Sequence, residues 1–462
     1  MDLAGLRFAM HNLGCKVNSY ETEAMTEAIL QEGARLVDFT EEADIYLINT
    51  CSVTNIADRK SRQMIHQAKQ RNPEAIVIAT GCYVEGKQEE LKEDKGIDIL
   101  IGNTGKGRVV ELIKAYREAM LENDASPMEP FSPVREEGEY ENLFLSKPKD
   151  KSRAFVKVQD GCNQYCSYCI IPFLRGNIRS RRPGEVRREA ERLAANGVRE
   201  LVLTGIHLSS YGRDFKNKEE REDFGDGAAN LLELLTLLDS VEGIERLRIG
   251  SLEPKIATPE FAEGLSKLKH FCPHFHLSLQ SGSNATLKRM NRRYTAEEFR
   301  AGVQALRAVF PDAAMTTDVI VGFPGESETE FEESLAFISE IAFYETHIFP
   351  YSKREGTKAA AMPEQLASAV KKERAARLQS LNAERQRAFR TRRLGSVQEM
   401  LSEEITEIDG ERYLIGNSRE YVKLAVPLTA LSEAPETNCL YRGKAERFLD
   451  AEILLLTNVS KT

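Results

Sequence analysis

The 462-residue sequence contains no long apolar segment and no excess of positive charge. No run approaches the roughly 18 consecutive apolar residues of a membrane-spanning helix, and residues 1–7 lack the apolar core of a signal peptide. The formal net charge is −9, so any surface that binds nucleic acid has to be local. We therefore expect a cytoplasmic protein that makes no contact with a membrane.

The composition is that of an ordinary globular protein. Apolar residues make up 41% and charged residues 29% of the chain, and its length allows about three domains. The chain contains eight cysteines. Because disulfides are rare in a reducing cytoplasm, these cysteines are more readily explained as ligands than as disulfides.

Three closely spaced cysteines are the most distinctive feature of the chain. Cys162, Cys166 and Cys169 have the spacing CxxxCxxC and directly follow residues 153–159, which resemble a strand. Cys-ligated iron–sulfur clusters usually have four ligands, so three leave one iron of a [4Fe-4S] cluster open. Radical S-adenosylmethionine (SAM) enzymes bind SAM at such an iron, and an electron from the cluster then yields a 5′-deoxyadenosyl radical.

Two other kinds of site fit this spacing. One is a zinc site completed by a distant fourth ligand, and the other is a set of redox-active thiols. The aromatic Tyr168 before the last cysteine favours the radical SAM interpretation. The position of the loop after a strand also favours it, because barrels carry their chemistry at strand ends.

The N-terminal part alternates between strands and helices. Strands are predicted at residues 6–10, 44–48, 75–79 and 97–101, with helices at 20–30, from 57 to about 72, and from about 103 to 120. This alternation predicts a parallel α/β sheet.

Cys15, Cys51 and Cys82 each lie just beyond one of the first three predicted strands. Because parallel strands end at one edge of a sheet, the three thiols are expected to lie together. A second cluster with three ligands and an open iron explains this better than three unrelated buried cysteines, although single buried cysteines are common.

The remaining chain is interpreted as a linker, a barrel and a small β-domain. Residues 123–148 form a polar linker, about six βα units run from residue 155 to 349, and residues 214–227 form an exposed acidic loop. A basic helix at 371–393 precedes short strands, which predict a small barrel. Cys272 and Cys439 are interpreted as ordinary buried thiols.

Four motifs together resemble the radical SAM methylthiotransferase family. They lie at residues 12–21, 49–54, 81–82 and 161–172. Residues 14–18 and 49–55, followed by 57–62, are most similar to the branch that modifies N6-threonylcarbamoyladenosine in tRNA. Ser19 and residues 83–85 depart from the usual pattern of that branch, but neither includes a cysteine.

The resemblance covers nearly the whole chain and implies an α/β multidomain protein. Its parts are an N-terminal methylthiotransferase domain with a parallel α/β sheet (1–118), a partial (β/α)6 radical SAM barrel (148–378) and a C-terminal TRAM β-barrel (380–457). TRAM binds tRNA in related enzymes. Residues 381–462 hold 12 Lys and Arg against 13 Asp and Glu, so net charge does not support RNA binding by this part, whereas the basic helix before it does.

The resemblance also implies cofactors and a reaction. Two [4Fe-4S] clusters are expected, one on Cys162, Cys166 and Cys169 that generates the radical from SAM, and one on Cys15, Cys51 and Cys82 that carries the sulfur. A radical is needed because the C2–H of adenine is neither acidic nor electrophilic. The expected product carries a methylthio group at C2 of adenosine 37.

Other site residues are implied at strand ends and beside the cluster loop. SAM contacts are expected from five residues: Tyr168, Gly205, Glu253, Gln280 and Gly322. Substrate phosphates or a substrate carboxylate are expected to meet four arginines, although such a charge run is as often only a solvated face: Arg175, Arg179, Arg181 and Arg182.

The expected partners are a tRNA anticodon stem-loop and an electron donor such as flavodoxin or ferredoxin. Three alternatives remain open at this stage. Two are other branches of the family, which modify isopentenyladenosine in tRNA or an aspartate of a ribosomal protein. The third is a non-catalytic iron–sulfur or zinc protein that binds RNA.

Overall fold

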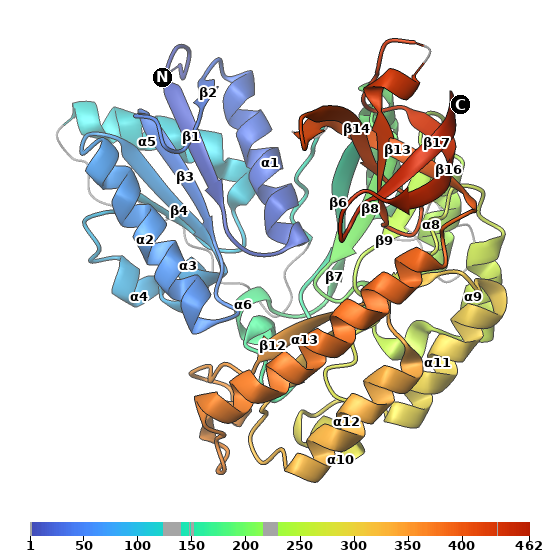
Figure 1. Ribbon diagram of the computed structural model, residues 1–462. Helices are drawn as coiled ribbons and strands as arrows, with labels where there is room; N and C mark the ends of the chain where they lie inside the picture. The colour runs from blue at the N-terminus through green and yellow to red at the C-terminus, as the bar shows by residue number, and fades with distance from the viewer. Residues whose placement is uncertain (1, 123–139, 147, 149–151, 216–229, 432) are drawn as a thin grey trace.

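The computed structural model has three parts in chain order (Figure 1). It describes residues 2–122, 140–146, 148, 152–215, 230–431 and 433–462. The predicted linker at 123–148 and acidic loop at 214–227 therefore lie mostly outside the described residues. All eight cysteines are described, and all are free thiols.

The N-terminal part is a parallel five-stranded sheet with the order β2-β1-β3-β4-β5. Its strands are β1 (Arg7–Asn12), β2 (Arg35–Val37), β3 (Ile45–Thr50), β4 (Ile76–Gly81) and β5 (Ile99–Ile101). The short, largely exposed edge strand β2 has too few apolar residues to be recognised from the sequence.

Helices cover both faces of this sheet, which confirms the predicted α/β arrangement (Figure 1). Apolar side chains of α1 and α5 pack on one face, and those of α2, α3 and α4 pack on the other. The central strands β3 and β4 are consequently buried along their whole length. The helices are α1 (Lys16–Gln31), α2 (Asn55–Arg71), α3 (Cys82–Gly86), α4 (Gln88–Leu91) and α5 (Val109–Leu121).

The central part is an open arc of six parallel strands, as the predicted partial barrel requires. Hydrogen bonds join β6, β8 and β9 in one group and β10, β11 and β12 in another. Single bridges from Leu247 to Phe271 and from Leu252 to Leu277 connect the groups. The strands are β6 (Arg153–Asp160), β8 (Glu200–Gly205), β9 (Arg246–Ile249), β10 (His274–His276), β11 (Ala314–Val321) and β12 (Glu345–Pro350).

One further short strand and a layer of helices complete this part. Strand β7 (Arg179–Ser180) pairs antiparallel with the end of β6. The helices are α6 (Ile171–Arg175), α7 (Pro183–Ala195), α8 (Leu231–Asp239), α9 (Pro259–Ser266), α10 (Asn284–Arg289), α11 (Ala296–Val309) and α12 (Glu328–Ile341).

Side chains alternate between the outside and the inside of the arc. Val156, Leu203, Ile249 and Phe275 point outward into the apolar core that the helices cover. Because successive side chains of a strand point to opposite faces, their neighbours along each strand point inward. The inward set is polar and includes Arg153, Lys157, Thr204, Arg248, His276 and Asp318.

The C-terminal part is a closed five-stranded barrel with the order β13-β14-β15-β17-β16, which confirms the predicted small β-barrel. In strand β16 charged residues alternate with the buried ones, so the sequence shows no apolar run there. The strands are β13 (Val397–Ile408), β14 (Glu411–Asn417), β15 (Lys423–Pro427), β16 (Leu440–Phe448) and β17 (Leu454–Lys461).

This barrel contacts the end of the arc at which the strands begin. Arg246, the first residue of β9, donates to the carbonyl oxygen of Asn417 at 2.8 Å. His274, the first residue of β10, packs against the ring of Tyr421, with 5.0 Å between ring centroids. The opposite end of the arc, which carries the cysteine loop, therefore stays free of the small barrel.

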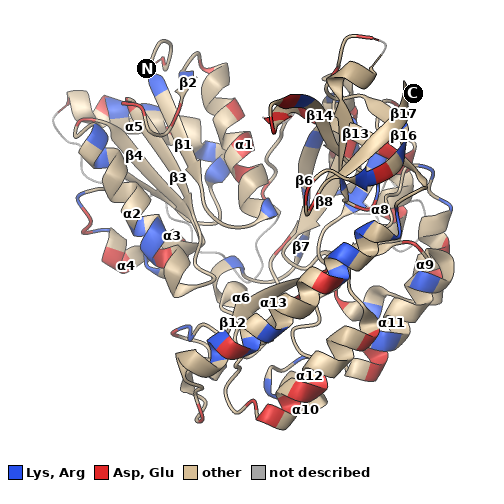
Figure 2. Ribbon diagram, viewed as in Figure 1, with Lys and Arg blue, Asp and Glu red and all other residues tan. Residues whose placement is uncertain are grey.

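Helix α13 (Ser368–Thr391) runs from the arc to the small barrel, so the boundary predicted near residue 379 falls inside one helix. The predicted domain limits therefore stay a proposal. Arg374 and Arg377 of this helix pair with Glu326, Glu328 and Glu332. Figure 2 shows basic positions along α13 and acidic positions on the neighbouring α12. Part of its positive charge is thus neutralised within the protein. Among the described residues, no helix is both long enough and apolar enough to cross a bilayer.

Candidate active site

The CxxxCxxC loop follows β6 through a glycine that cannot be replaced without moving the chain. Gly161 has φ +72°, and a Cβ there would lie 1.8 Å from the carbonyl oxygen of Asn177. Backbone hydrogen bonds from Cys162 to Gly176 and from Cys169 to Cys166, both 3.0 Å, close the loop. The sequence therefore folds the three cysteines into one compact turn.

The electrostatics of this first triad indicate a site for a cation. Burial, and to a smaller extent the neighbouring thiols, raise the pKa of Cys162 to about 11 and that of Cys169 to about 12. Cys166 is also buried. Thiols whose ionisation is opposed in this way become thiolates readily only when positive charge is bound beside them. The donor set thus fits an iron–sulfur cluster.

Arg292 supplies a fixed positive charge beside the first triad. Its Nη1 lies 3.1 Å from the Sγ of Cys166, and its Nη2 donates to Glu253 at 2.7 Å. Arg292 also lowers the pKa of Cys162 and Cys169, against the larger effect of burial. Sequence reasoning missed this residue because it lies 123 positions after Cys169 in a segment without a cysteine.

The second triad lies at the carboxyl edge of the N-terminal sheet. Cys15 follows β1 at the start of α1, Cys51 follows β3, and Cys82 begins α3 directly after β4. Since β1, β3 and β4 are neighbours, the structure brings the three ends together. Burial, and to a smaller extent the nearby Cys82 and Cys15, raise the pKa of Cys51 to about 11.

Glycines allow the close approach of the chain segments in this triad. A Cβ on Gly14 would lie 3.1 Å from the Sγ of Cys51. Gly81 has φ +99°, and a Cβ there would lie 2.5 Å from the carbonyl oxygen of Thr50. The side chain of Cys15 is solvent-accessible, yet burial raises its pKa.

Helix α6 links the two triads. It begins two residues after Cys169, and the carbonyl oxygen of its Leu174 accepts a hydrogen bond of 2.9 Å from Asn103. Asn103 Nδ2 in turn lies 3.6 Å from the Sγ of Cys82. One short helix and one amide side chain thus separate the loop of the first triad from a cysteine of the second.

The structure gives three of the four candidate substrate arginines internal partners. Arg175 pairs with Glu21 at 3.0 Å and with Asp160 at 3.1 Å, Arg179 lies 3.8 Å from Asp160, and Arg181 pairs with Glu189. Arg175, Arg179 and Arg181 are buried, and only Arg182 is exposed. We therefore assign the first three to the interior and keep Arg182 as a predicted RNA contact.

Glu21 and Asp160 are the centres of this ionic network. Lys157 pairs with Glu21 at 2.7 Å and with Asp160 at 2.6 Å, and Lys106 pairs with Glu21 as well. Although burial opposes it, the surrounding cations hold the pKa of Glu21 well below its usual range. The network joins α1 to β6 and α6, and it thereby fixes the two parts of the protein to each other.

The residues predicted to bind SAM lie in two different settings. Tyr168 and Glu253 are close to the first triad, Tyr168 in the loop itself and Glu253 through Arg292. Gln280 has a left-handed backbone with φ +66°. At Gly205 and Gly322 a Cβ would meet Gln159 at 2.9 Å and Lys371 at 2.4 Å, so internal packing accounts for both glycines. All five stay predictions as SAM contacts.

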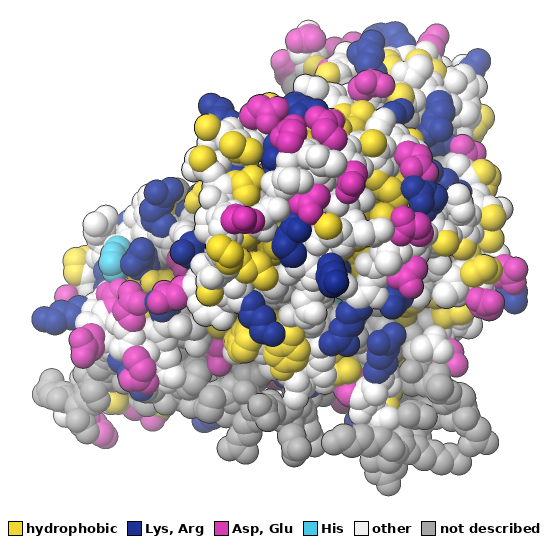
Figure 3. Space-filling view, turned by 90° about the horizontal axis from the view of Figure 1, so that it is seen from below, with side chains coloured by type: hydrophobic (Ala, Val, Ile, Leu, Met, Phe, Trp, Pro, Cys, Tyr) yellow, Lys and Arg dark blue, Asp and Glu magenta, His cyan; other side chains and the backbone are white. Residues whose placement is uncertain are grey.

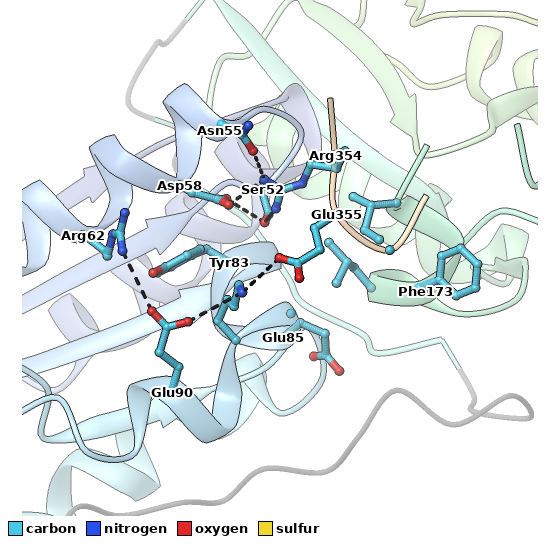
Figure 4. Close-up of a pocket in the computed structure, with 15 residues that line it drawn as sticks. Ser52, Asn55, Asp58, Arg62, Tyr83, Glu85, Glu90, Phe173, Arg354 and Glu355 are labelled. Atoms are coloured by element: carbon cyan, nitrogen blue, oxygen red, sulfur yellow. Dashed lines mark hydrogen bonds and ion pairs between the residues drawn. The ribbon is translucent and has the colours of Figure 1, made fainter. Parts of the chain in front are cut away.

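A pocket of about 570 Å³ lies between the N-terminal part and the arc (Figure 4). It is bounded by α2, α3, α6 and residues 354–356. Arg354 reaches across to Asp58 at 2.6 Å and also donates to Ser52 and Asn55. Since Ser52 follows Cys51 and the pocket residue Ile170 follows Cys169, the pocket lies beside both cysteine loops.

Exposed apolar side chains surround the cysteine loops. Tyr165 and Phe173 are 43% and 63% exposed and meet edge to face at 5.9 Å. Val53 and Ile56, just after Cys51, are also more than half exposed, at 54% and 58%. Large apolar groups at this place form a surface on which bases can stack.

Two family matches cover the N-terminal sheet and most of the central arc. Residues 156–338 match the Radical SAM superfamily, and residues 7–102 match a family described as uncharacterized protein family UPF0004. Among solved structures, the chain is similar to the radical SAM methyltransferase TsrM of Kitasatospora setae with cobalamin and a [4Fe-4S] cluster bound. The TM-score is 0.53 and the identity 16%, over 75% of each chain, so this likeness concerns the fold alone.

Curated relatives match nearly the whole chain. The threonylcarbamoyladenosine tRNA methylthiotransferase MtaB of Bacillus subtilis is 41% identical over 90% of this chain and 89% of its own. The protein of the same name from Aquifex aeolicus is 38% identical over 88% and 96%. A tRNA-2-methylthio-N(6)-dimethylallyladenosine synthase of Moorella thermoacetica is 35% identical over 89% and 90%.

Proposed function

Because the chain belongs to the radical SAM methylthiotransferase family, we propose that it converts N6-threonylcarbamoyladenosine 37 of tRNA to the 2-methylthio derivative. The observation that carries the proposal is the pair of thiol triads, one at the sheet edge of the N-terminal part and one at the open end of the arc. The name of the 41% identical relative supports the choice of base.

The residues of the chain hold and shield the reacting groups. Cys162, Cys166 and Cys169 would hold one [4Fe-4S] cluster, and Cys15, Cys51 and Cys82 would hold the other. When bound, these clusters and SAM supply the radical and the sulfur that replace the C2–H of adenine by a methylthio group. Arg292 stabilises the thiolate of Cys166 through its charge at 3.1 Å.

A base reaches this site only if it leaves the stacked anticodon loop. The exposed Tyr165 and Phe173 offer faces for the neighbouring bases, and Arg182 offers a charge for a phosphate. On the face seen in Figure 3, Lys and Arg side chains are interspersed with those of Asp and Glu. The proposed partner is therefore an anticodon stem-loop held mainly at the mouth of the site.

The proposal also includes an electron donor and a cellular location for the enzyme. Reductive cleavage of SAM requires an electron, and a small redox protein such as flavodoxin or ferredoxin is the proposed donor. Modification of tRNA takes place where tRNA is used in translation, which supports a cytoplasmic location.

The test compares anticodon stem-loops that differ only at N6 of the target adenosine. Reconstituted protein, SAM and a reductant are incubated with threonylcarbamoyl, isopentenyl and unmodified forms, and the nucleosides are analysed by mass spectrometry. We expect a methylthio product from the threonylcarbamoyl form. Product from the isopentenyl form alone would assign the chain to the other tRNA branch. SAM cleavage in none of the reactions would favour a non-catalytic RNA-binding protein.

The matched control is a cysteine outside both triads. Cys439 lies in the core of the small barrel. Cys439→Ala should retain product formation, whereas Cys82→Ala should abolish it.

A further inference from the structure

Three side chains that can bind a metal ion lie together on neighbouring strands of the arc. They are His276 on β10, Asp318 on β11 and His347 on β12. Each offers one ligand atom, and the three atoms all lie within 4.8 Å of one another. None of these residues belongs to a cysteine triad or to the residues expected to contact SAM, so the cluster requires an explanation of its own.

The pairing of the three strands produces this arrangement. Asp318 on β11 is the direct partner of His347 on β12 in the parallel sheet. His276 on β10 is the direct partner of Thr316, which lies two residues before Asp318 on β11. Residues two apart on a strand point to the same face of the sheet, as do direct partners on neighbouring strands. All three side chains therefore point into the arc.

Contacts within the cluster show that the ligand atoms converge. Nε2 of His276 lies 3.2 Å from a carboxylate oxygen of Asp318. The rings of His276 and His347 are stacked, with 5.6 Å between their centroids and 27° between their planes. Two imidazole rings and one carboxylate thus border the same small space.

A hydrogen bond to a buried hydroxyl group orients the ring of His276. Its Nδ1 lies 3.0 Å from Oγ1 of Thr316, and Thr316 is buried. When the hydroxyl accepts from Nδ1–H, Nε2 is the nitrogen that is left to bind a cation. Metal-bound histidines almost always donate their other ring N–H to such an acceptor, and this contact fixes the tautomer and the direction of the ring.

A comparison with another His–Asp pair shows what is particular to this cluster. His66 and Asp94 form an ion pair at 2.9 Å, close to the distance between His276 and Asp318. In the described part of the chain, however, no third ligand accompanies His66 and Asp94. A pair of this kind is an ordinary surface contact, whereas three converging ligands can hold an ion.

The cluster is also accessible from solvent. The side chains of His276 and Asp318 are 12% and 29% exposed, and His347 is exposed. Within the described ranges, His347 forms no hydrogen bond or ion pair, so its ring nitrogens are available to a ligand. An ion can therefore enter from solvent, and three protein ligands leave a fourth position for water or another oxygen ligand.

The donor atoms determine which kind of ion fits. Mg²⁺ and Ca²⁺ prefer oxygen ligands throughout, whereas two imidazole nitrogens and one carboxylate suit Zn²⁺ and the neighbouring transition metals. We propose that His276, Asp318 and His347 form a mononuclear site for a divalent transition metal ion, separate from both cysteine triads and with one open position toward the interior of the arc. This inference goes beyond the proposed function and does not depend on it.

The first test measures zinc binding by the holoenzyme, in which the clusters already occupy the cysteine triads. Reconstituted protein is equilibrated with Zn²⁺ and passed through a desalting column, and zinc and iron are measured per chain. The site variants are His347→Ala and Asp318→Asn, each of which removes one ligand. The matched control is His66→Ala, which removes the histidine of the exposed pair.

Wild type and His66→Ala should each retain about one zinc per chain, with unchanged iron. Both site variants should bind zinc about 100-fold more weakly or worse, because two ligands cannot close the site. Excess Mg²⁺ should leave the zinc of wild type in place, because Mg²⁺ binds imidazole poorly.

The second test identifies the ligand atoms without a substitution. X-ray absorption at the zinc edge of the loaded wild-type protein should show nitrogen and oxygen ligands at about 2.0–2.1 Å. The positioning role of Thr316 is tested by Thr316→Val, which should lower zinc affinity by about 10- to 100-fold in a calorimetric titration.

Four results would overturn the proposed site. The first is a wild-type protein that retains no zinc, and the second is an equal affinity for zinc in wild type and both site variants. The third is displacement of the zinc by Mg²⁺. The fourth is a sulfur shell at about 2.3 Å, which would place the zinc on cysteines instead.

Discussion

Arg292 lies outside the CxxxCxxC motif, but its charge acts on the thiols of that motif. Its side chain is only 5% exposed, contacts Cys166 and is held in place by Glu253 and by the hydroxyl group of Tyr294 at 3.0 Å. Positive charge beside a thiolate favours ionisation and makes a bound cluster easier to reduce. Arg292 is therefore a positioning residue for the first triad.

We expect Arg292→Gln to lower the rate of 5′-deoxyadenosine formation by about tenfold, because a charge-assisted contact is lost while the three thiols remain. The iron content should be unchanged, and the reduction potential of the cluster should become more negative. The adjacent, exposed Arg293→Gln is the control and should match wild type. A wild-type potential and rate in Arg292→Gln would contradict the role.

Replacement of one cysteine should affect 5′-deoxyadenosine formation and methylthio transfer differently in the two triads. Cys166→Ala should abolish both 5′-deoxyadenosine and the methylthio product. Cys51→Ala should still produce 5′-deoxyadenosine but no methylthio product, because only the first triad is proposed to act on SAM. Chromatography of the small molecules together with mass spectrometry of the RNA distinguishes the two patterns. Abundant 5′-deoxyadenosine from Cys166→Ala would reverse the assignment.

At the scale of elements, the contact between α1, β6 and α6 fixes the position of the two triads relative to each other. Its centre is Glu21, which has three cationic partners: Lys106, Lys157 and Arg175. A buried ion pair does not by itself imply great stability, but removal of one partner leaves its counterions uncompensated. The contact is therefore sensitive to single substitutions.

We expect Glu21→Gln to lower the free energy of unfolding by about 3–5 kcal/mol, since three buried cations lose their main carboxylate. Urea unfolding of the cluster-free protein measures this change. Glu42→Gln removes an exposed partner of Arg7 and should change the free energy of unfolding little, because solvent screens such a pair. Equal effects of the two substitutions would show that the buried network adds little.

The same network predicts the response to acid. The pKa values of Glu21 and Asp160 are lower in the folded protein than their ordinary values of 4.5 and 3.8. Their contribution is therefore complete above about pH 4.5 and is lost as the pH falls toward the folded-state pKa values. Below that pH the stability of Glu21→Gln should fall less steeply than that of wild type.

At the scale of the whole molecule, the two triads belong to different parts of the chain and should load independently. Anaerobic reconstitution should give about eight irons per chain, four for each cluster. Replacement of Cys162, Cys166 and Cys169 together by Ala should leave about half of the iron. Iron and protein assays on the folded variant check this, and a complete loss of iron would mean that the clusters depend on each other.

The sequence by itself determined the parts of the protein that depend on local pattern. Alternating strands and helices predicted the parallel sheet and about six βα units, and the spacing CxxxCxxC predicted a single loop with three converging thiols. The closing of these units into a partial barrel was implied by the family resemblance. The sequence also predicted that Cys15, Cys51 and Cys82 lie close together, because the carboxyl ends of neighbouring parallel strands share one edge of the sheet. Strands β2 and β16 could not be recognised from the sequence, because the apolar run of β2 is short and that of β16 is interrupted by charged residues.

Only the tertiary structure decided which charges face the site. In the sequence, Arg175, Arg179 and Arg181 form a basic run, but long-range carboxylates such as Glu21 bind them in the interior. Conversely, Arg292 has no local signal, and it acquires its role because it meets Cys166 in a loop far away in the chain. Local spacing fixes which residues share a turn, whereas ion pairing and burial depend on contacts that only the packed chain creates.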